Sequence, residues 1–227
     1  MASSTATLAA RAYGALRREI TSGVLKPGDR LVRRDIAKRL GVSTIPVIEA
    51  LLRLEHDGLV ESKPNCGARV RPLTLEAIEN ECVLREAIEC QVARLVAETA
   101  DDRQLEELGA SAQRLDAMMQ RVDPGSVIGM ERHMEFHLRL AEIAGYPLLR
   151  EQLEAIWLRH LMQLNWVNAA ILPVPEKWHG KLMNAFKARD PDTAEAVMRQ
   201  HVRYGQRTLS EAIQRMGGHV VPGEEGS

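Results

Sequence analysis

The run from Leu31 to Ala68 constrains the fold of this chain more than any other stretch. Gly41 can adopt the left-handed conformation that ends a helix, and Ser43 can cap a new one. Apolar residues recur at helical spacing on both sides of this turn, namely Ile36, Ala37 and Leu40 before it and Val47, Ala50, Leu51 and Leu54 after it. The pattern predicts a helix, a tight turn and a second helix.

Short strands are predicted around this pair of helices. Residues 59–62 and 68–71 are expected to form two short strands around a turn at 64–67, and residues 30–32 can add a third strand. A first helix is expected from residue 8 to about Gly23, because Leu8, Ala12, Leu16 and Ile20 repeat every four residues. A helix-turn-helix followed by a hairpin is a winged helix, and its usual ligand is duplex DNA.

This N-terminal part resembles the DNA-binding domain of GntR-family bacterial transcription regulators. The matching blocks are Ile20-x-x-Gly23-x-Leu25-x-Pro27-Gly28-x-Arg30-Leu31, then Val42-Ser43-x-x-Pro46-Val47-x-Glu49-Ala50-Leu51-x-Arg53-Leu54-Glu55, and then Gly58-Leu59-Val60. The family usually has Arg at two positions of the recognition helix. This chain has Thr44 and Ile48 there, which suit a thymine methyl better than a guanine edge.

The expected DNA-binding residues lie on the two helices and the wing. Basic side chains would contact phosphates, although any one of them could instead be a solvated surface charge. The resemblance singles out Arg34, and it implies that the wing approaches the minor groove near Asn65, Cys66 and Gly67. The full set is Arg33, Arg34, Ser43, Thr44, Ile45, Pro46, Ile48, Arg53, Asn65, Gly67 and Arg69.

Charge is distributed unevenly along the chain. Residues 1–73 carry 13 Lys and Arg against 7 Asp and Glu, whereas the remainder carries 17 against 24. A basic head on an acidic body suits a protein that presents one part to DNA. The sequence has no long apolar run and no signal peptide, and its three cysteines form no CxxC motif. We therefore expect a cytoplasmic protein with no membrane partner.

The rest of the chain is predicted to be all-helical. The periodicity indicates helices at 75–98, 102–121, 125–144, 147–170, 176–189 and 191–214, with Pro147 and Asp190-Pro191 as start signals. With aromatic residues at only 4%, the core must consist of aliphatic side chains, as in helical bundles. The expected organisation is mainly α, with a winged helix-turn-helix domain at 1–73, an all-helical domain at 74–214 and a disordered tail at 215–227.

Four of the seven histidines fall inside these predicted helices, at His133, His137, His179 and His201. His133 and His137 are separated by four residues, so they share one helical face and could reach one metal ion. Two histidines can also fall at this spacing by chance. The sequence around them is more informative than the spacing.

The second half resembles the FCD effector domain of the FadR subgroup of GntR regulators. The resemblance rests on Phe136-His137-x-x-Leu140-Ala141 with Ala144-Gly145, on His179-x-x-Leu182-x-x-Ala185-Phe186-x-x-Arg189-Asp190, and on Met198-x-x-His201. Many FCD domains have metal sites of one Asp and three His. The match implies His137, His179 and His201 as the three histidines, with His133 in the place usually held by Asp.

An all-imidazole ligand set favours a divalent transition metal, Zn or Ni in particular, over Mg, Ca or Mn. The alternative is a metal-free pocket lined by these polar residues. Glu131 and Glu135 lie two positions from His133 and point away from its face, so neither easily restores the carboxylate. The resemblance also implies that Arg85 binds an effector carboxylate, whereas an ordinary helical salt bridge from Arg85 to Glu89 would explain it equally well.

Together these features predict a homodimeric, DNA-binding transcription regulator that is not an enzyme and that binds double-stranded operator DNA. Repression is the commoner behaviour in the family, and a small-molecule carboxylate effector would act at or near the metal. Two other classes stay open from the sequence: a metal-dependent enzyme, and a metal-binding interaction module whose DNA-binding head has decayed.

Overall fold

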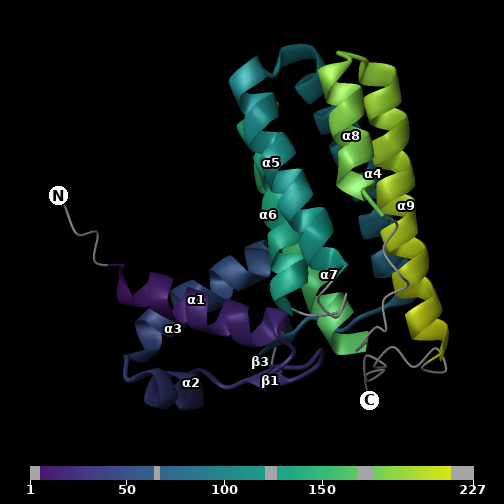
Figure 1. Ribbon diagram of the computed structural model, residues 1–227. Helices are drawn as coiled ribbons and strands as arrows, with labels where there is room; N and C mark the ends of the chain where they lie inside the picture. The colour runs from purple at the N-terminus through teal and green to yellow at the C-terminus, as the bar shows by residue number, and fades with distance from the viewer. Residues whose placement is uncertain (1–5, 64–66, 121–126, 168–175, 216–227) are drawn as a thin grey trace. The chain divides into compact units, whose positions relative to one another are not determined.

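The computed structural model describes residues 6–63, 67–120, 127–167 and 176–215, and this part of the chain is mainly helical (Figure 1). It forms two units. The first contains the described residues up to Leu73 together with Leu158–Trp166, and the second contains the described residues between and after those segments. None of the described helices is long and apolar enough to cross a membrane.

The first unit is a small helical domain with a three-stranded antiparallel sheet in the order β1-β3-β2. The register pairs Arg30 with Arg69 and Val60 with Val70. The winged helix predicted from the sequence is therefore confirmed. Its elements are α1 (Leu8–Thr21), β1 (Arg30–Leu31), α2 (Arg33–Leu40), α3 (Thr44–His56), β2 (Val60–Lys63) and β3 (Gly67–Val70).

The turn between α2 and α3 has the conformation that its residues predict. Gly41 has φ 66°, in the left-handed region, and it ends α2. Ser43 stands at the N-cap of α3, but its side chain makes no capping hydrogen bond. The expectation that Ser43 caps this helix through its hydroxyl is wrong, and the exposed hydroxyl instead stays on the outer surface.

Packing of α1 on α3 makes the core of the first unit. Leu16 and Ile20 from α1 are fully buried, as are Val47 and Leu54 from α3. Burial of each such side chain contributes roughly 1.5–3 kcal/mol relative to exposure. The opposite face of α3 is left to solvent, which presents its outer residues to a partner.

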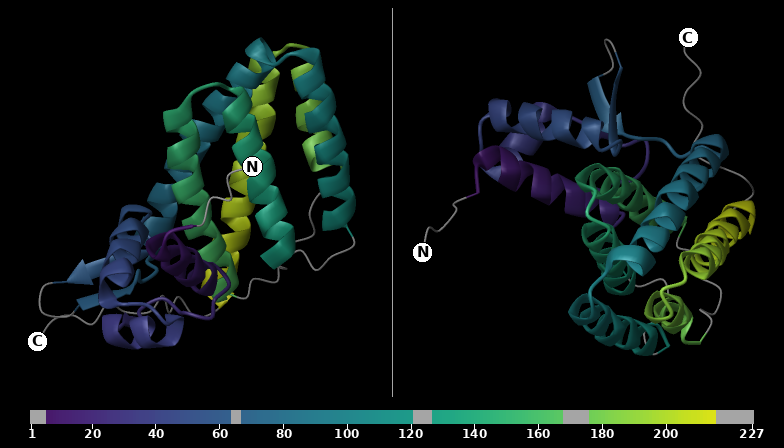
Figure 2. Two further views of the ribbon diagram at one scale, coloured as in Figure 1. Left: turned by 90° about the vertical axis from the view of Figure 1, so that its left-hand side faces the viewer. Right: turned by 90° about the horizontal axis from the view of Figure 1, so that it is seen from above.

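The second unit is a bundle in which α4 packs along α9, and α5 packs against both α6 and α8. Both views in Figure 2 show these helices running side by side. The helices are α4 (Leu75–Thr99), α5 (Asp102–Met119), α6 (Val127–Ile143), α8 (Trp178–Lys187) and α9 (Pro191–Arg215). The first part of α7 (Pro147–Val167) belongs to the same unit, whereas its residues Leu158–Trp166 belong to the first unit.

All six helices predicted for this half are present, and no strand occurs among its described residues. Asp190 caps α9 as expected, since its Oδ1 accepts from the backbone N–H of Thr193 at 3.0 Å. The largest difference is α8, which begins at Trp178 rather than 176 and ends at Lys187 rather than 189. Lys177 before it has φ 53° and no capping side chain, so the first turn of α8 depends on another helix for its hydrogen bonds.

Cys82 and Cys90 are both buried on α4 as free thiols. Burial raises the pKa of Cys90 to about 11, so this thiol stays protonated. Cys66 and Asn65 lie outside the described residues, as does most of the predicted tail.

Candidate metal centre

Four histidines from three helices meet inside the second unit. His133 and His137 lie on α6, His179 on α8 and His201 on α9, and all four are buried. Each offers a ligand nitrogen, and these atoms lie within 4.8 Å of one another. Only the helical spacing of His133 and His137 is a local feature, so the tertiary fold, which brings α8 and α9 near α6, completes the set.

Three of the ring nitrogens point at a common point. The Nε2 atoms of His133 and His201 are 2.8 Å apart, those of His137 and His133 are 3.0 Å apart, and those of His137 and His201 are 3.1 Å apart. Two nitrogens bound at right angles to one ion, at metal–nitrogen distances of about 2.1 Å, lie about 3 Å apart. The separations therefore fit a shared metal ion.

The fourth ring supplies an unsatisfied atom. Nε2 of His179 is buried and has no hydrogen-bond partner in the described part of the protein. A buried imidazole nitrogen without a partner is costly unless something else occupies its lone pair. A metal ion bound by the other three histidines would do so.

Burial favours the neutral form of three of these rings, those of His133, His137 and His201. Burial lowers the pKa of His133 well below its usual value, and the neighbouring rings of His137 and His201 lower it further. The pKa of His201 is lowered for the same reasons, and that of His137 is lowered by burial despite the charge of Glu89. Only the neutral imidazole has a free lone pair, so the cluster is ready for a cation at neutral pH.

Two carboxylates that the sequence did not assign to the cluster lie next to the Nδ1 atoms of two of its rings. Oε2 of Glu89 on α4 lies next to Nδ1 of His137. Asp116 on α5 lies with Oδ1 2.6 Å from Nδ1 of His179. A carboxylate behind a metal-ligating histidine is a usual feature of protein metal sites.

The two carboxylates are ionised. Burial by itself would raise the pKa of Glu89, but His137 and Arg85 outweigh it and lower that pKa to about 2. Asp116 likewise has a lowered pKa, because hydrogen bonds from His179 and Gly180 outweigh its burial. Glu131 and Glu135, by contrast, are exposed and take no part, in agreement with their predicted direction.

Arg85 is buried beside the cluster, and its Nε donates to Oε1 of Glu89 at 2.6 Å. Its guanidinium carbon lies 3.9 Å from the centre of the Trp157 ring. The helical salt bridge that the sequence offered as an alternative is therefore present. The same indole ring lies 5.1 Å from both His133 and His137, which places Arg85 close to the histidines.

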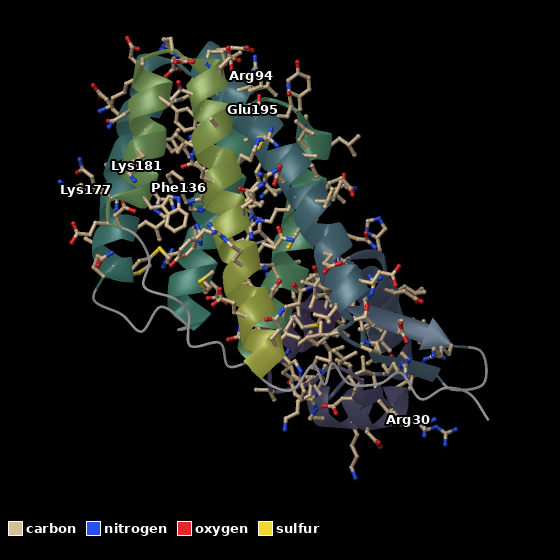
Figure 3. All side chains as sticks on the ribbon, turned by 90° about the vertical axis from the view of Figure 1, so that its right-hand side faces the viewer. Arg30, Arg94, Phe136, Lys177, Lys181 and Glu195 are labelled. Carbon is tan, nitrogen blue, oxygen red and sulfur yellow. The ribbon has the colours of Figure 1, made fainter. Side chains whose placement is uncertain are left out.

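The outer side of the cluster is closed by Trp178. Its ring lies 4.8 Å from His201 and 4.4 Å from Tyr204, edge to face. Beyond it, a groove of about 850 Å³ runs along α9 and includes Lys181 and Arg207. Phe136 points into the bundle, whereas Lys177 and Lys181 lie on its outside (Figure 3).

On the first unit, the residues predicted to bind DNA fall into two groups. Arg33 and Arg34 are exposed at the start of α2, and with Arg30 and Gly67 they line a hollow of about 420 Å³ beside the wing. The second group lies at the start of α3. Ser43, Thr44 and Ile45 are exposed there, and Pro46 and Ile48 are half-buried.

Two of the predicted DNA contacts already have partners within the protein. Arg53 lies over the ring of Tyr13, 4.0 Å from its centre, and Nε of Arg69 donates to Glu61 at 2.7 Å. Arg39, at the end of α2, is likewise paired with Glu19. These contacts leave Arg33 and Arg34 as the better placed basic groups.

Comparison with known proteins gives matches over both units. Residues 8–70 match the family model for bacterial regulatory proteins of the gntR family, and residues 82–204 match the FCD domain. The HTH-type transcriptional repressor RspR of Escherichia coli is 26% identical over 207 residues, which cover 90% of this chain and 88% of that protein. The E. coli regulator McbR is 28% identical over 181 residues, covering 78% of this chain and 81% of McbR.

The fold has the same relatives. A solved structure of E. coli McbR/YncC superposes with a TM-score of 0.74 at 24% identity, covering 93% of this chain and all of that one. A putative GntR regulator from Rhodococcus sp. RHA1 gives a TM-score of 0.70, also at 24% identity, over 90% of this chain and 98% of the other. The relatives are named as transcription regulators rather than enzymes.

Proposed function

Because this chain belongs to the GntR family of bacterial transcription regulators and carries an FCD domain, we propose that it is a metal-dependent repressor controlled by a small carboxylate. The winged helix binds operator DNA and the chain acts as a homodimer. Effector binding in the helical unit changes the affinity for DNA, as the coupling of two binding sites requires. The family assignment disfavours the enzyme and the decayed-module alternatives.

One observation carries the proposal: four buried imidazoles whose ligand atoms lie within 4.8 Å of one another. In a metal-free pocket, the buried Nε2 of His179 would lack a partner. His133, His137, His179 and His201 would hold the ion. Imidazole ligands favour Zn or Ni among the divalent metals.

The chemistry of the ligand set supports a carboxylate effector. An imidazole is uncharged when it binds a metal, so a site made of histidines leaves the full positive charge on a divalent ion, which when bound acts as a Lewis acid toward an anionic oxygen. Arg85 uses Nε for Glu89, and we propose that its amino groups receive the effector carboxylate. A guanidinium is suited to this role because it binds a carboxylate through two parallel hydrogen bonds.

The surface of α3 supports a modified operator. Thr44 and Ile45 are exposed at the start of the helix and Ile48 lies one turn on, half-buried. Guanine is read most often by Arg or Lys, and neither occurs at positions 44 and 48. We propose that the protein selects a half-site with thymine at the family's guanine positions while Arg33 and Arg34 bind phosphates.

The test begins with elemental analysis of the purified full chain before and after incubation with Zn or Ni. About one metal per chain is expected, with loss of metal in His179→Ala and His201→Ala. A band shift on the DNA upstream of its own gene, with and without a library of small carboxylates, then measures the response. The two variants should still bind DNA but should no longer respond to the effector.

Circular dichroism of each variant shows whether the fold is intact. Replacement of the exposed Lys181 by Ala on the same helix as His179 is the matched control, and it should retain metal. A wild-type chain that stays metal-free after incubation, with a melting temperature unaffected by chelator, would contradict the metal-dependent part of the proposal.

A further inference from the structure

A line of three buried side chains connects α4 to the histidine cluster. Nε of Arg85 donates to Oε1 of Glu89 at 2.6 Å, and Oε2 of Glu89 is paired with Nδ1 of His137. The side chains of Glu89 and His137 are each 1% exposed and that of Arg85 is 4% exposed. Water therefore has little access to any of these contacts.

The donor and acceptor properties of the three groups allow one arrangement of protons. A guanidinium has only donors, and an ionised carboxylate has only acceptors. Oε2 of Glu89 lies beside Nδ1 of His137. Since an ionised Glu89 has no proton to donate, a hydrogen bond between these two atoms requires that Nδ1 carry the hydrogen. A neutral imidazole has a single N–H, so Nε2 of His137 is left with a free lone pair.

That lone pair faces the centre of the cluster. Nε2 of His137 lies 3.0 Å from Nε2 of His133 and 3.1 Å from Nε2 of His201. A metal ligand must be unprotonated. The tautomer selected by Glu89 is therefore the one that can bind an ion at this place.

We propose that Glu89 is a positioning residue: held by Arg85, it keeps the proton of His137 on Nδ1 so that Nε2 is free to bind metal. The proposal rests on the metal-dependent function above and adds a residue that determines whether the site can be occupied. It also gives the Arg85–Glu89 pair a role other than stabilising α4.

Asp116 stands in a similar relation to His179, but it has a second role. Its Oδ1 also accepts from the backbone N–H of His179 at 3.2 Å, and its Oδ2 accepts from that of Gly180 at 3.1 Å. Replacing Asp116 would disturb the start of α8 as well as the ring. Glu89 makes no such backbone contact among the hydrogen bonds of the described residues, so it is the better position for a test.

The substitution Glu89→Gln changes one oxygen into an NH₂ group with almost no change in shape. Because Arg85 can only donate, the amide oxygen turns toward Arg85 and the NH₂ turns toward His137. Nδ1 of His137 must then accept, and its proton moves to Nε2. An N–H group would point into the cluster where the ion should bind. The corresponding Asp→Asn change beside a catalytic histidine acts in this way.

The experiment measures the tautomer directly. Long-range ¹H–¹⁵N correlation spectra of imidazole nitrogens are recorded on the full chain after metal removal, with His137→Gln used to assign the signals of His137. We expect the Nδ1–H form in the wild type and the Nε2–H form in Glu89→Gln. Zinc affinity, measured by competition with a chromogenic chelator, should fall by about 10- to 100-fold in Glu89→Gln.

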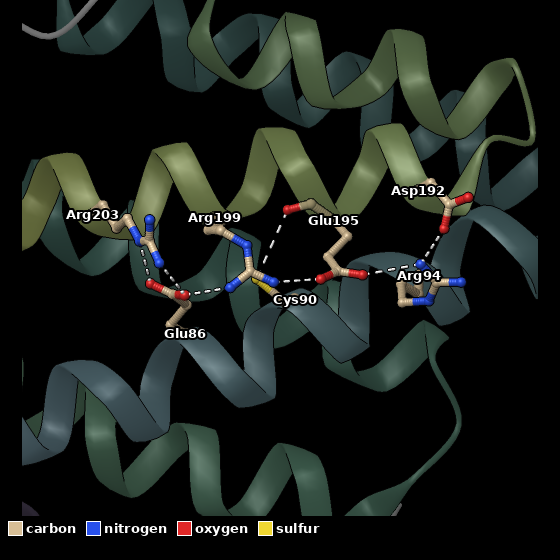
Figure 4. A network of polar contacts seen from close by, with 7 residues as sticks. All are labelled: Glu86, Cys90, Arg94, Asp192, Glu195, Arg199 and Arg203. Atoms are coloured by element: carbon tan, nitrogen blue, oxygen red, sulfur yellow. Dashed lines mark hydrogen bonds and ion pairs between the residues drawn. The ribbon is translucent and has the colours of Figure 1, made fainter.

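Glu86→Gln is the matched control, because it makes the same chemical change one turn earlier on α4. Glu86 pairs with Arg199 and Arg203 on α9 rather than with a histidine (Figure 4). The control variant should keep the Nδ1–H form of His137 and the wild-type affinity for zinc.

The outcomes separate this inference from the proposed function. A wild-type chain that binds no zinc contradicts the metal site, while the tautomer in the metal-free protein still tests the role of Glu89. Zinc binding by Glu89→Gln equal to that of the wild type overturns the inference and leaves the metal site standing. If Glu89→Gln does not fold, the wild-type spectrum decides, because an Nε2–H form of His137 there is incompatible with the proposal.

Discussion

At the residue scale, the exposed face of α3 is where this chain departs most from the pattern of the GntR family. Thr44 and Ile45 are exposed and Ile48 is half-buried, so the helix offers methyl groups and one hydroxyl where two guanidinium groups are usual. Each bidentate Arg–guanine contact contributes about 1–3 kcal/mol of discrimination. We therefore expect the two missing contacts to change which DNA sequence is bound.

We expect the double variant Thr44→Arg with Ile48→Arg to select guanine-containing half-sites from a random DNA pool more strongly than the wild type does. Both positions reach solvent, so the fold should tolerate the change. Binding by the wild type should still fall steeply with salt, since phosphate contacts by Arg33 and Arg34 would remain. Equal guanine selection by the two proteins would show that Thr44 and Ile48 do not determine the operator.

At the element scale, α8 depends on a neighbour for its first turn. Lys177 supplies no capping side chain, and Asp116 on α5 accepts the backbone N–H groups of His179 and Gly180 instead. The same carboxylate holds the ring of His179. One residue of α5 thus positions both the backbone and the ring of a histidine in the cluster.

Asp116→Ala should lower the free energy of unfolding by about 1 kcal/mol or more, the usual cost of losing an N-cap acceptor. Urea titrations followed by circular dichroism, with metal removed by chelator, provide the measurement. Asp102→Ala is the control, because the side chain of Asp102 is 97% exposed and its pairing with Arg189 should contribute little. Equal destabilisation by the two variants would argue against a capping role for Asp116.

The packing of α4 along α9 includes a chain of charged contacts, drawn in Figure 4. Glu86 on α4 accepts hydrogen bonds from Arg199 and Arg203 on α9. Cys90, on the same helix as Glu86, is uncharged because its pKa is raised. Hydrogen bonds from Arg203 and from Arg199 lower the pKa of Glu86 from its ordinary value of 4.5, although partial burial opposes this shift. Protonation of Glu86 therefore weakens the contact between the helices.

The sign of the pH dependence follows from that lowered pKa. Stability from ionised Glu86 is fully present above pH 4.5 and is lost as the pH falls through the lower folded-state pKa. The stability difference between wild type and Glu86→Gln should therefore shrink on acidification below pH 4.5. Chemical denaturation at a series of pH values checks this, and a difference that grows on acidification would contradict it.

At the scale of the whole molecule, we expect operator recognition to require more than one copy of the chain. A single winged helix offers few base contacts, and paired half-sites normally provide the required specificity. We expect a homodimer formed through the helical unit. Sedimentation of the full chain at micromolar concentration, with and without zinc, is the measurement, and a single monomeric species in both conditions would exclude this arrangement.

The local pattern of the sequence was enough to predict the winged helix and the six helices of the second half. Gly41 ends α2 and Asp190 caps α9 because these are short-range effects of backbone conformation and hydrogen bonding. The ends of α8 were less well predicted, because its first turn is held by Asp116, which lies 63 residues before His179 in the chain. Local propensity contains no information about such a partner.

The candidate site, too, was predicted only in part from the sequence. The sequence alone selected the four histidines and the Arg85–Glu89 pair, through helical spacing and the resemblance of the surrounding residues. Only the tertiary structure decided that Glu89 also reaches His137 and that Asp116 reaches His179. Spacing along one helix places residues on a face, but which face meets which depends on how the helices pack. The carboxylates behind the rings were therefore decided by tertiary packing.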